Sequence, residues 1–365
     1  MLSLSPTPDD FRLLMARPIH GPNYWSRQSV TRLDIAAGVW DYIPSNAVPG
    51  LTEALVTALP GLIEHRCSVG ERGGFIQRLR RGTYLPHIIE HVGLELQIAI
   101  GHDVGFGRAR GGDRPGEYTV VFQHLHTAVG TRAATLAVQL VRDAFRGSLS
   151  DAGCALEELS IIAETPEPIV HREEIDCGIT GGAGRAAVRR EIHRHRVPRQ
   201  ARILDVRPSE LLESGLPYTR SRVAVILDAC PRDVPWRYRE PDRARQLVSV
   251  LADGVPRDGY LIVPAEDPAL TGMARESGCR PAVFSISHEP TREVDYSWPR
   301  ADVHAGRIII RRDGKLSDEG PLNPDSSIVA QVAGSLAAYL LRDGSSTSSA
   351  SREPVSMIGS GTPAG

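Results

Sequence analysis

The sequence predicts an α/β protein in two parts: an α+β N-terminal domain, followed by an α/β domain with a mostly parallel sheet. The first part mixes Gly/Pro turns with stretches of helical spacing and one strand-like run, Tyr118 to Phe122. In the second part, short apolar runs alternate with helical stretches, which is typical of a parallel sheet covered by helices. With 365 residues and 41% apolar side chains, the chain is long enough for two separate cores.

Changes in composition set the predicted boundaries. We expect an N-terminal extension over 1–16, a first domain over 17–150, a linker over 151–174, a second domain over 175–342 and a disordered tail over 343–365. Within the domains, the spacing of apolar residues predicts the main elements. Helices are expected over 51–59, 86–100, 131–145, 243–251 and 327–341, and further strands over 203–206, 223–227, 260–263, 282–285 and 307–310.

The charge pattern excludes two classes of partner. The formal net charge is -2, with acids and bases mixed along the chain, so neither nucleic acid nor anionic membrane is an expected partner. No apolar run approaches the ~20 residues that span a bilayer, and residues 1–10 have no signal-peptide pattern. We therefore expect a cytoplasmic protein. The oligomeric state is left open, a homo-oligomer included.

The numbers of cysteines and lysines restrict the chemistry that the chain can carry. Five cysteines at wide spacings, without a Cys-x-x-Cys pair, favour free thiols over disulfides or a thiolate zinc site. Arginine supplies nearly all of the basic charge, and Lys315 is the only lysine.

A His-x-x-Glu-His motif lies in the predicted helix over 86–100. His87 and His91 are one turn apart on the same face, so their imidazoles can bind one divalent cation, and Glu90 can take a proton from a metal-bound water. This order of residues is typical of the inverzincin class of metal hydrolases. The pattern therefore predicts a zinc site with Glu90 as catalytic base.

The motif supplies only two of the three protein ligands that a catalytic zinc needs. Glu95, four residues after His91, and His124 and His126, which follow the strand-like run, are candidates for the third ligand. The alternative is that these histidines and glutamates only decorate a half-exposed helix face.

Several short motifs in order resemble the N-terminal domain of cyanophycin synthetases over about residues 17 to 147. They are Gly21-Pro-Asn-Tyr-Trp-Ser26, Pro60-Gly-Leu62, Glu64-His-Arg-Cys-Ser68, Gly73-Gly-Phe75, Gly82-Thr-Tyr84, His87-Ile-Ile-Glu-His-Val92, Leu94-Glu-Leu-Gln97 and Val104-Gly-Phe-Gly-Arg108. In that family the domain holds the polymer, and in some members it resembles a metallopeptidase that trims it. The resemblance implies that His87 and His91 are metal ligands and that Glu90 is the base. The stretch Gln123 to His126 departs from the family, which often has acids there.

A glycine-rich loop follows the apolar run that ends near Thr180. It resembles the phosphate loop of Mur ligases and of the cyanophycin synthetase C-terminal module, with Gly181, Gly182 and Gly184 kept. Arg185 stands where the family has its phosphate-binding lysine, and Ala186 stands where a hydroxyl would bind Mg²⁺. We therefore expect that ATP and Mg²⁺ are not used, and that the loop only caps a helix.

The rest of the second domain resembles a degenerate and truncated Mur-ligase central domain. The family's Asn-x-x-x-Asp-His stretch is replaced by Asp228-Ala-Cys-Pro-Arg-Asp-Val234. The ATP-grasp module and the C-terminal Mur domain of the family have no counterpart in the sequence. These departures predict a domain that has lost ligase chemistry.

Three functions follow, in order of preference. The first is a metal-dependent hydrolase of cyanophycin-type β-Asp-Arg peptides, with Arg78 and Arg108 binding substrate carboxylates. The second is a non-catalytic protein that binds the polymer or a full-length ligase and regulates it. The third is an ATP-dependent cyanophycin ligase.

Overall fold

The computed structural model describes residues 11–67, 70–167, 172–195, 197–198, 200–287 and 297–345, so most of the expected extension and tail lies outside it. The chain forms two compact units, and each consists of three segments. The first unit comprises 1–172, 208–219 and 231–250, and the second comprises 173–207, 220–230 and 251–365. Among the described residues, no helix is both long enough and apolar enough to cross a membrane.

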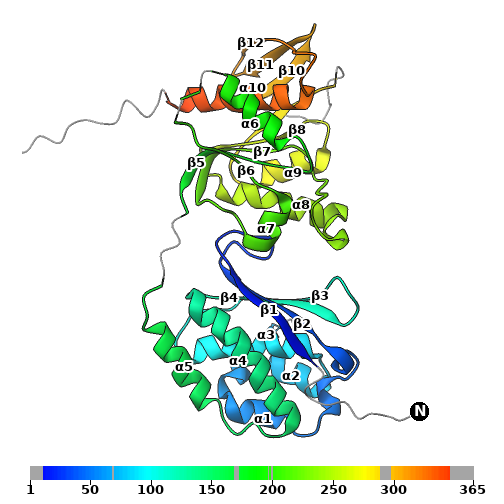
Figure 1. Ribbon diagram of the computed structural model, residues 1–365, viewed down its shortest axis with the longest axis vertical. Helices are drawn as coiled ribbons and strands as arrows, with labels where there is room; N and C mark the ends of the chain where they lie inside the picture. The colour runs from blue at the N-terminus through cyan, green and yellow to red at the C-terminus, as the bar shows by residue number, and fades with distance from the viewer. Residues whose placement is uncertain are drawn as a thin grey trace, which may run out of the picture. The chain divides into compact units, whose positions relative to one another are not determined.

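The first unit contains an antiparallel four-stranded sheet in the order β1-β2-β4-β3. Its strands are β1 (Arg12–Ile19), β2 (Val30–Ala36), β3 (Gly107–Gly111) and β4 (Glu117–Gln123). Helices α3 and α4 lie on one face of this sheet, and their apolar sides form the core with its inward residues (Figure 1). The α-helices are α1 (Leu51–Ala58), α2 (Gly74–Arg81), α3 (Leu85–Ala99), α4 (Thr127–Arg146), α5 (Gly153–Ala163), α7 (Pro208–Ser214) and α8 (Pro241–Ser249).

A glycine sets the close approach of α3 to the sheet. A Cβ atom on Gly93 would lie 2.5 Å from Cε1 of Phe122, a buried residue of β4. The ring of Phe122 therefore packs directly against the backbone of α3 at Gly93, which fixes the height of the neighbouring α3 residues above the sheet.

Gly93→Ala is expected to destabilise the protein by about 1–3 kcal/mol, because the added methyl group overpacks the contact with Phe122. The matched control is Gly272→Ala in α9 (Pro268–Glu276), where an added Cβ meets nothing within 4 Å. This control should stabilise by up to about 1 kcal/mol, because alanine is the better helix former. Urea denaturation measures both. Equal effects of the two substitutions would contradict the overpacking argument.

The second unit is built on an eight-stranded sheet in the order β12-β11-β10-β9-β8-β7-β5-β6. The strands β6, β5, β7, β8, β9 and β10 run parallel, and β11 and β12 continue the sheet antiparallel. The predicted mostly parallel sheet is confirmed. The strands are β5 (Glu174–Thr180), β6 (Ile203–Asp205), β7 (Arg220–Ile226), β8 (Tyr260–Pro264), β9 (Arg280–Phe284), β10 (Arg300–His304), β11 (Arg307–Arg312) and β12 (Lys315–Pro321).

Helices cover both faces of this second sheet. Helix α6 (Arg185–Arg194) and helix α10 (Ile328–Ser345) pack together on one face, and α9 lies on the other (Figure 1). The central strands are therefore shielded on both sides, and Val223 to Ile226 of β7 are all buried. Such continuous apolar runs are what a central parallel strand requires.

Candidate functional site

The first unit contains a cavity of about 690 Å³ above one face of α3. Three segments form its walls: one side of α3, residues between Gly61 and Cys67, and residues between Val104 and Arg110. Its volume is in the range of small-molecule sites, ~300–1,000 Å³. It holds most of the residues that the His-x-x-Glu-His motif singled out.

The motif lies on α3 as predicted, and its two histidines face the same side. Pro86 occupies the first turn of the helix, where its missing N–H costs nothing. The Nε2 atoms of His87 and His91 lie 3.1 Å apart, and Nδ1 of His87 lies 2.8 Å from the hydroxyl of Thr83. The helical spacing thus brings the two imidazoles into contact.

Cys67 completes a group that can hold a metal ion. Its Sγ lies 3.1 Å from Nε2 of His87, and the ligand atoms of Cys67, His87 and His91 all lie within 4.8 Å of one another. Cys67 has a positive φ of 54°, a conformation that few non-glycine residues adopt. One thiolate and two imidazoles form a donor set that zinc accepts. The roles of the two histidines as ligands stay a prediction.

His65 links the histidine pair to Glu95. Its Nδ1 lies 2.8 Å from Nδ1 of His91, and its Nε2 lies 2.8 Å from Oε2 of Glu95. Glu95, a candidate third ligand, is thus paired with His65 and lies outside the metal-capable group of the described residues. Its carboxylate orients His65, which in turn contacts His91.

Burial controls the ionisation of the motif. Burial lowers the pKa of His87 to about 4 and that of His91 to about 2, with Arg78 adding to the effect on His87. Burial also raises the pKa of Glu90 to about 7, which the positive charge of Arg108 partly opposes. At neutral pH both imidazoles are therefore neutral, and the Glu90 carboxyl is close to half-protonated.

The other predicted site residues lie apart from this cluster. His124 is buried, with Nδ1 3.0 Å from the hydroxyl of Thr31, and His126 pairs with Glu167 at 3.0 Å. Neither lines the cavity. Arg108 does line it, whereas Arg78 acts on it only through its charge near His87.

Sequence reasoning missed His65 and Cys67 as neighbours of the motif. Both stand in Glu64-His-Arg-Cys-Ser68, which was noted only as part of a resemblance, and Cys67 was expected to be a plain free thiol. Their approach to α3 depends on the turn at Cys67 and on the short 3₁₀ helix Pro60–Glu64, and neither has a periodic signal.

The glycine-rich loop lies in the second unit, between β5 and the first residue of α6. The backbone N–H of Gly182 donates to Oδ1 of Asp228 at 2.8 Å, and the N–H of Cys230 donates to the same oxygen at 2.8 Å. Gly184 has a φ of 84°, and a Cβ on Gly182 would clash with the carbonyl of Cys230. The carboxylate of Asp228 thus accepts from the loop N–H of Gly182, near the N-terminus of α6, where backbone N–H groups favour negatively charged oxygens.

Arg185 and Lys315 are the two cationic residues that the sequence singled out as possible phosphate contacts, and they lie at very different distances from this loop. Arg185 folds back so that Nη1 donates to the carbonyl of Gly181, beside the oxyanion-binding N–H groups. Lys315 begins β12, six strands away from β5 across the sheet, which is about 29 Å at the usual strand spacing. Arginine, not lysine, is therefore the cation within reach of an anion at the loop.

The comparisons with known proteins identify the first unit. Residues 32–146 match the family model of the cyanophycin synthase-like N-terminal domain. The chain is 44% identical over 146 residues to the cyanophycin synthetase of Synechocystis sp., a match that covers 39% of this chain and 16% of that protein. It is 46% identical over 135 residues to the enzyme of Crocosphaera subtropica, covering 36% and 15%. The predicted resemblance is confirmed for the N-terminal part of the chain, and the match spans about a sixth of these relatives.

Solved structures similar to the chain include two ligases. A MurF ligase from Thermotoga maritima in complex with ADP is 12% identical, with a TM-score of 0.34, and the match covers 48% of this chain and 46% of that one. A pseudomurein peptide ligase type C from Methanothermus fervidus is 13% identical, with a TM-score of 0.32, covering 51% and 48%. At these TM-scores the likeness carries no argument about the site.

Two functional expectations are corrected by the relatives. The preferred hypothesis of a metal-dependent hydrolase is contradicted, because the matched relatives are named as synthetases, enzymes that form bonds. The expectation that ATP and Mg²⁺ are not used is contradicted as well, because a synthetase couples bond formation to cleavage of a nucleoside triphosphate. Zinc and peptidase activity gain no support from these relatives.

Proposed function

We propose that this chain acts in ATP-dependent amide-bond formation of the cyanophycin synthetase type, the last of the three functions considered. The observation that carries the proposal is the identity of 44–47% to five cyanophycin synthetases over 131–146 residues of the chain. A ligase needs a site for the substrate and a site for the nucleotide. We assign the first to the cavity of the first unit and the second to the glycine-rich loop of the second unit.

The cavity above α3 is proposed to hold the growing peptide or polymer. Its walls carry both signs of charge, with Glu90 and Glu95 on one side and Arg108 and Arg110 on the other. A zwitterionic chain of aspartate and arginine residues presents carboxylates and guanidinium groups that match such walls. We expect this work to take place in the cytoplasm, where ATP is available.

The glycine-rich loop is proposed to hold the nucleotide. Phosphate oxygens would lie at the positive end of α6, where the N–H of Gly182 would exchange the carboxylate of Asp228 for a phosphate, and the guanidinium of Arg185 would leave the carbonyl of Gly181 to take the place of the usual lysine. Asp228, at the carboxyl end of the neighbouring strand β7, would supply a carboxylate to Mg²⁺. ATP, when bound, supplies activation of a carboxylate by phosphoryl transfer.

Binding of Mg-ATP to the full chain tests the proposal. Calorimetric titration should show binding by the wild type, and Arg185→Ala should weaken it about tenfold, because a charged hydrogen-bond donor to phosphate is removed. The matched control is Arg194→Ala, at the far end of the same helix, which loses only an exposed ion pair with Glu191.

Release of ADP in the presence of a cyanophycin primer, aspartate and arginine is the second readout. A wild-type protein that binds no Mg-ATP, or an Arg185→Ala protein that binds it equally well, would contradict the ligase proposal. Binding of the primer without any nucleotide effect would instead favour a polymer-binding partner.

A further inference from the structure

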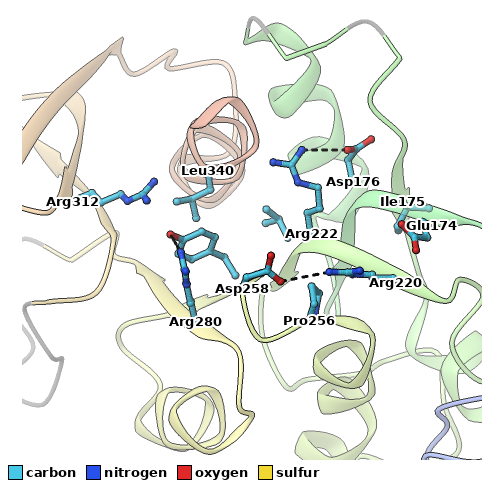
Figure 2. A pocket seen from close by; sticks show the side chains of 13 residues that line it. Glu174, Ile175, Asp176, Arg220, Arg222, Pro256, Asp258, Arg280, Arg312 and Leu340 are labelled. Carbon is cyan, nitrogen blue, oxygen red and sulfur yellow. Dashed lines mark hydrogen bonds and ion pairs between the residues drawn. The ribbon is translucent and has the colours of Figure 1, made fainter. Parts of the chain in front are cut away.

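A second cavity, of about 590 Å³, lies at the amino ends of the parallel strands in the second unit. Residues that begin β5, β7, β8 and β9 line it, together with Arg312 and Leu340 (Figure 2). The glycine-rich loop lies at the opposite end of β5, and seven residues of extended strand span about 20 Å. This cavity is therefore separate from the proposed nucleotide site.

Arginine dominates the lining of this cavity. Its ionisable lining residues include four arginines and three acids: Arg220, Arg222, Arg280, Arg312, Glu174, Asp176 and Asp258. The arginines come from β7, β9 and β11, yet their side chains line the same space (Figure 2). A small cavity with several guanidinium groups has a positive potential that favours anions.

Two of these arginines are held by weak, exchangeable ion pairs. Arg220 lies 3.5 Å from Asp258, and Arg222 lies 3.9 Å from Asp176. The Asp258 side chain is 76% exposed, so the pair with Arg220 is well solvated and of little net stability. A ligand carboxylate or phosphate can replace these acids at low cost, because a bidentate contact with a guanidinium is stronger.

The other two arginines share one aromatic ring. The guanidinium carbons of Arg280 and Arg312 lie 5.7 and 5.5 Å from the centre of the Tyr260 ring, and Nη1 of Arg280 is 3.3 Å from its hydroxyl. Both long side chains are thereby oriented before any ligand arrives, which lowers the entropy lost on binding. Nε of Arg312 also lies 3.2 Å from Oδ2 of Asp313, whose side chain is 74% exposed, so this ion pair is solvated and a bidentate ligand oxyanion can replace it.

We propose that this cavity is a binding site for a small oxyanion with two negative charges, carried by carboxylate or phosphate groups. Arg280 and Arg312 hold the anion beside Tyr260, and Arg220 turns to it from Asp258. The planar guanidinium fork suits both kinds of oxyanion. The apolar side chains of Leu340 and Ile175 leave room for a short carbon skeleton.

Calorimetric titration of the full chain with succinate, and separately with inorganic phosphate, tests this site at constant ionic strength. At least one probe should bind, and the double variant Arg280→Gln/Arg312→Gln should weaken that binding about tenfold or more. The matched control is Arg307→Gln on β11, which loses an exposed ion pair with Asp318 outside the cavity and should bind as the wild type does. Preference for succinate indicates a carboxylate ligand, and preference for phosphate indicates a phosphorylated one.

A substitution that is expected to tighten binding distinguishes a true effect on the site from misfolding of the variant. Asp258→Asn removes the carboxylate that competes for Arg220, so it should tighten binding of the same probe about threefold. Arg185→Ala should leave binding unchanged, because the loop is a different site. The proposal is overturned if neither probe binds, if the double variant binds normally, if Asp258→Asn weakens binding, or if only Arg185→Ala abolishes it.

Discussion

Phe75→Ala is expected to lower the free energy of unfolding by about 3–5 kcal/mol, the usual cost of emptying a buried aromatic site. Phe75 is fully buried in α2, and its ring stacks on the imidazole of His91, with ring centres 4.0 Å apart. It also meets the ring of His87 edge-on at 5.7 Å. The substitution therefore removes both core packing and the apolar wall behind the histidine pair.

The same substitution should change the histidines themselves. Burial is the largest cause of the lowered pKa of His91, so water entering the space left by Phe75 should raise that pKa toward its ordinary value. Urea denaturation gives the stability change, and NMR titration gives the pKa. The control is Ile98→Ala on α3, where a 39% exposed side chain should cost about 0.5 kcal/mol or less. A loss under about 1 kcal/mol for Phe75→Ala would refute the assigned packing.

Glu90→Gln is expected to make the protein more stable than the wild type at pH 8, by up to about 3 kcal/mol, with little difference at pH 4. Burial raises the pKa of Glu90 from 4.5 to about 7, so the folded state favours the protonated carboxyl. That stabilisation is fully present below pH 4.5 and is lost as the pH rises through 7. Glutamine imitates the protonated carboxyl and does not ionise. The variant therefore keeps the stability that the wild type loses when Glu90 ionises.

The histidines change stability in the opposite direction. The pKa values of His87 and His91 are lowered, so their neutral forms contribute stability above pH 6.5 that is lost on acidification. Both proteins share this effect, and it cancels in the difference between them. Chemical denaturation between pH 4 and 8, in a chelating buffer, measures that difference. The exposed Glu53→Gln in α1 is the control, and a pH-independent difference for Glu90→Gln would contradict the buried carboxyl.

Much of the fold could be predicted from the sequence, because its strongest signals are periodic. The apolar spacing placed both ends of α3 within one residue and the start of α10 within one residue, and the apolar run at Val223 to Leu227 marked β7 as a buried parallel strand. The same spacing placed His87 and His91 on one face, and the structure confirms their contact.

The neighbours of the motif could not be predicted, since they come from tertiary structure. Cys67 and His65 reach α3 through a turn with a positive φ, and no local pattern encodes that approach. The same holds for the cavity beside Tyr260, whose arginines are brought together from three strands by the sheet register. Chemistry inferred from a motif alone also misled: His-x-x-Glu-His suggested a hydrolase, but the relatives are synthetases.

Because the first unit consists of three separate segments, a truncated protein contains all of it only if it includes all three. Residues 208–219 and 231–250 belong to it, with Leu216 donating to the carbonyl of Pro22 and Tyr238 packing edge-on against Tyr24 and Trp25. A clone that ends at Arg172 would uncover these aromatic rings and leave the hydrogen bond unmade. Gene fusions that exchange only residues 1–172 would therefore carry an incomplete first unit with exposed aromatic rings, whereas exchanges that carry residues through Val250 would include its other two segments as well.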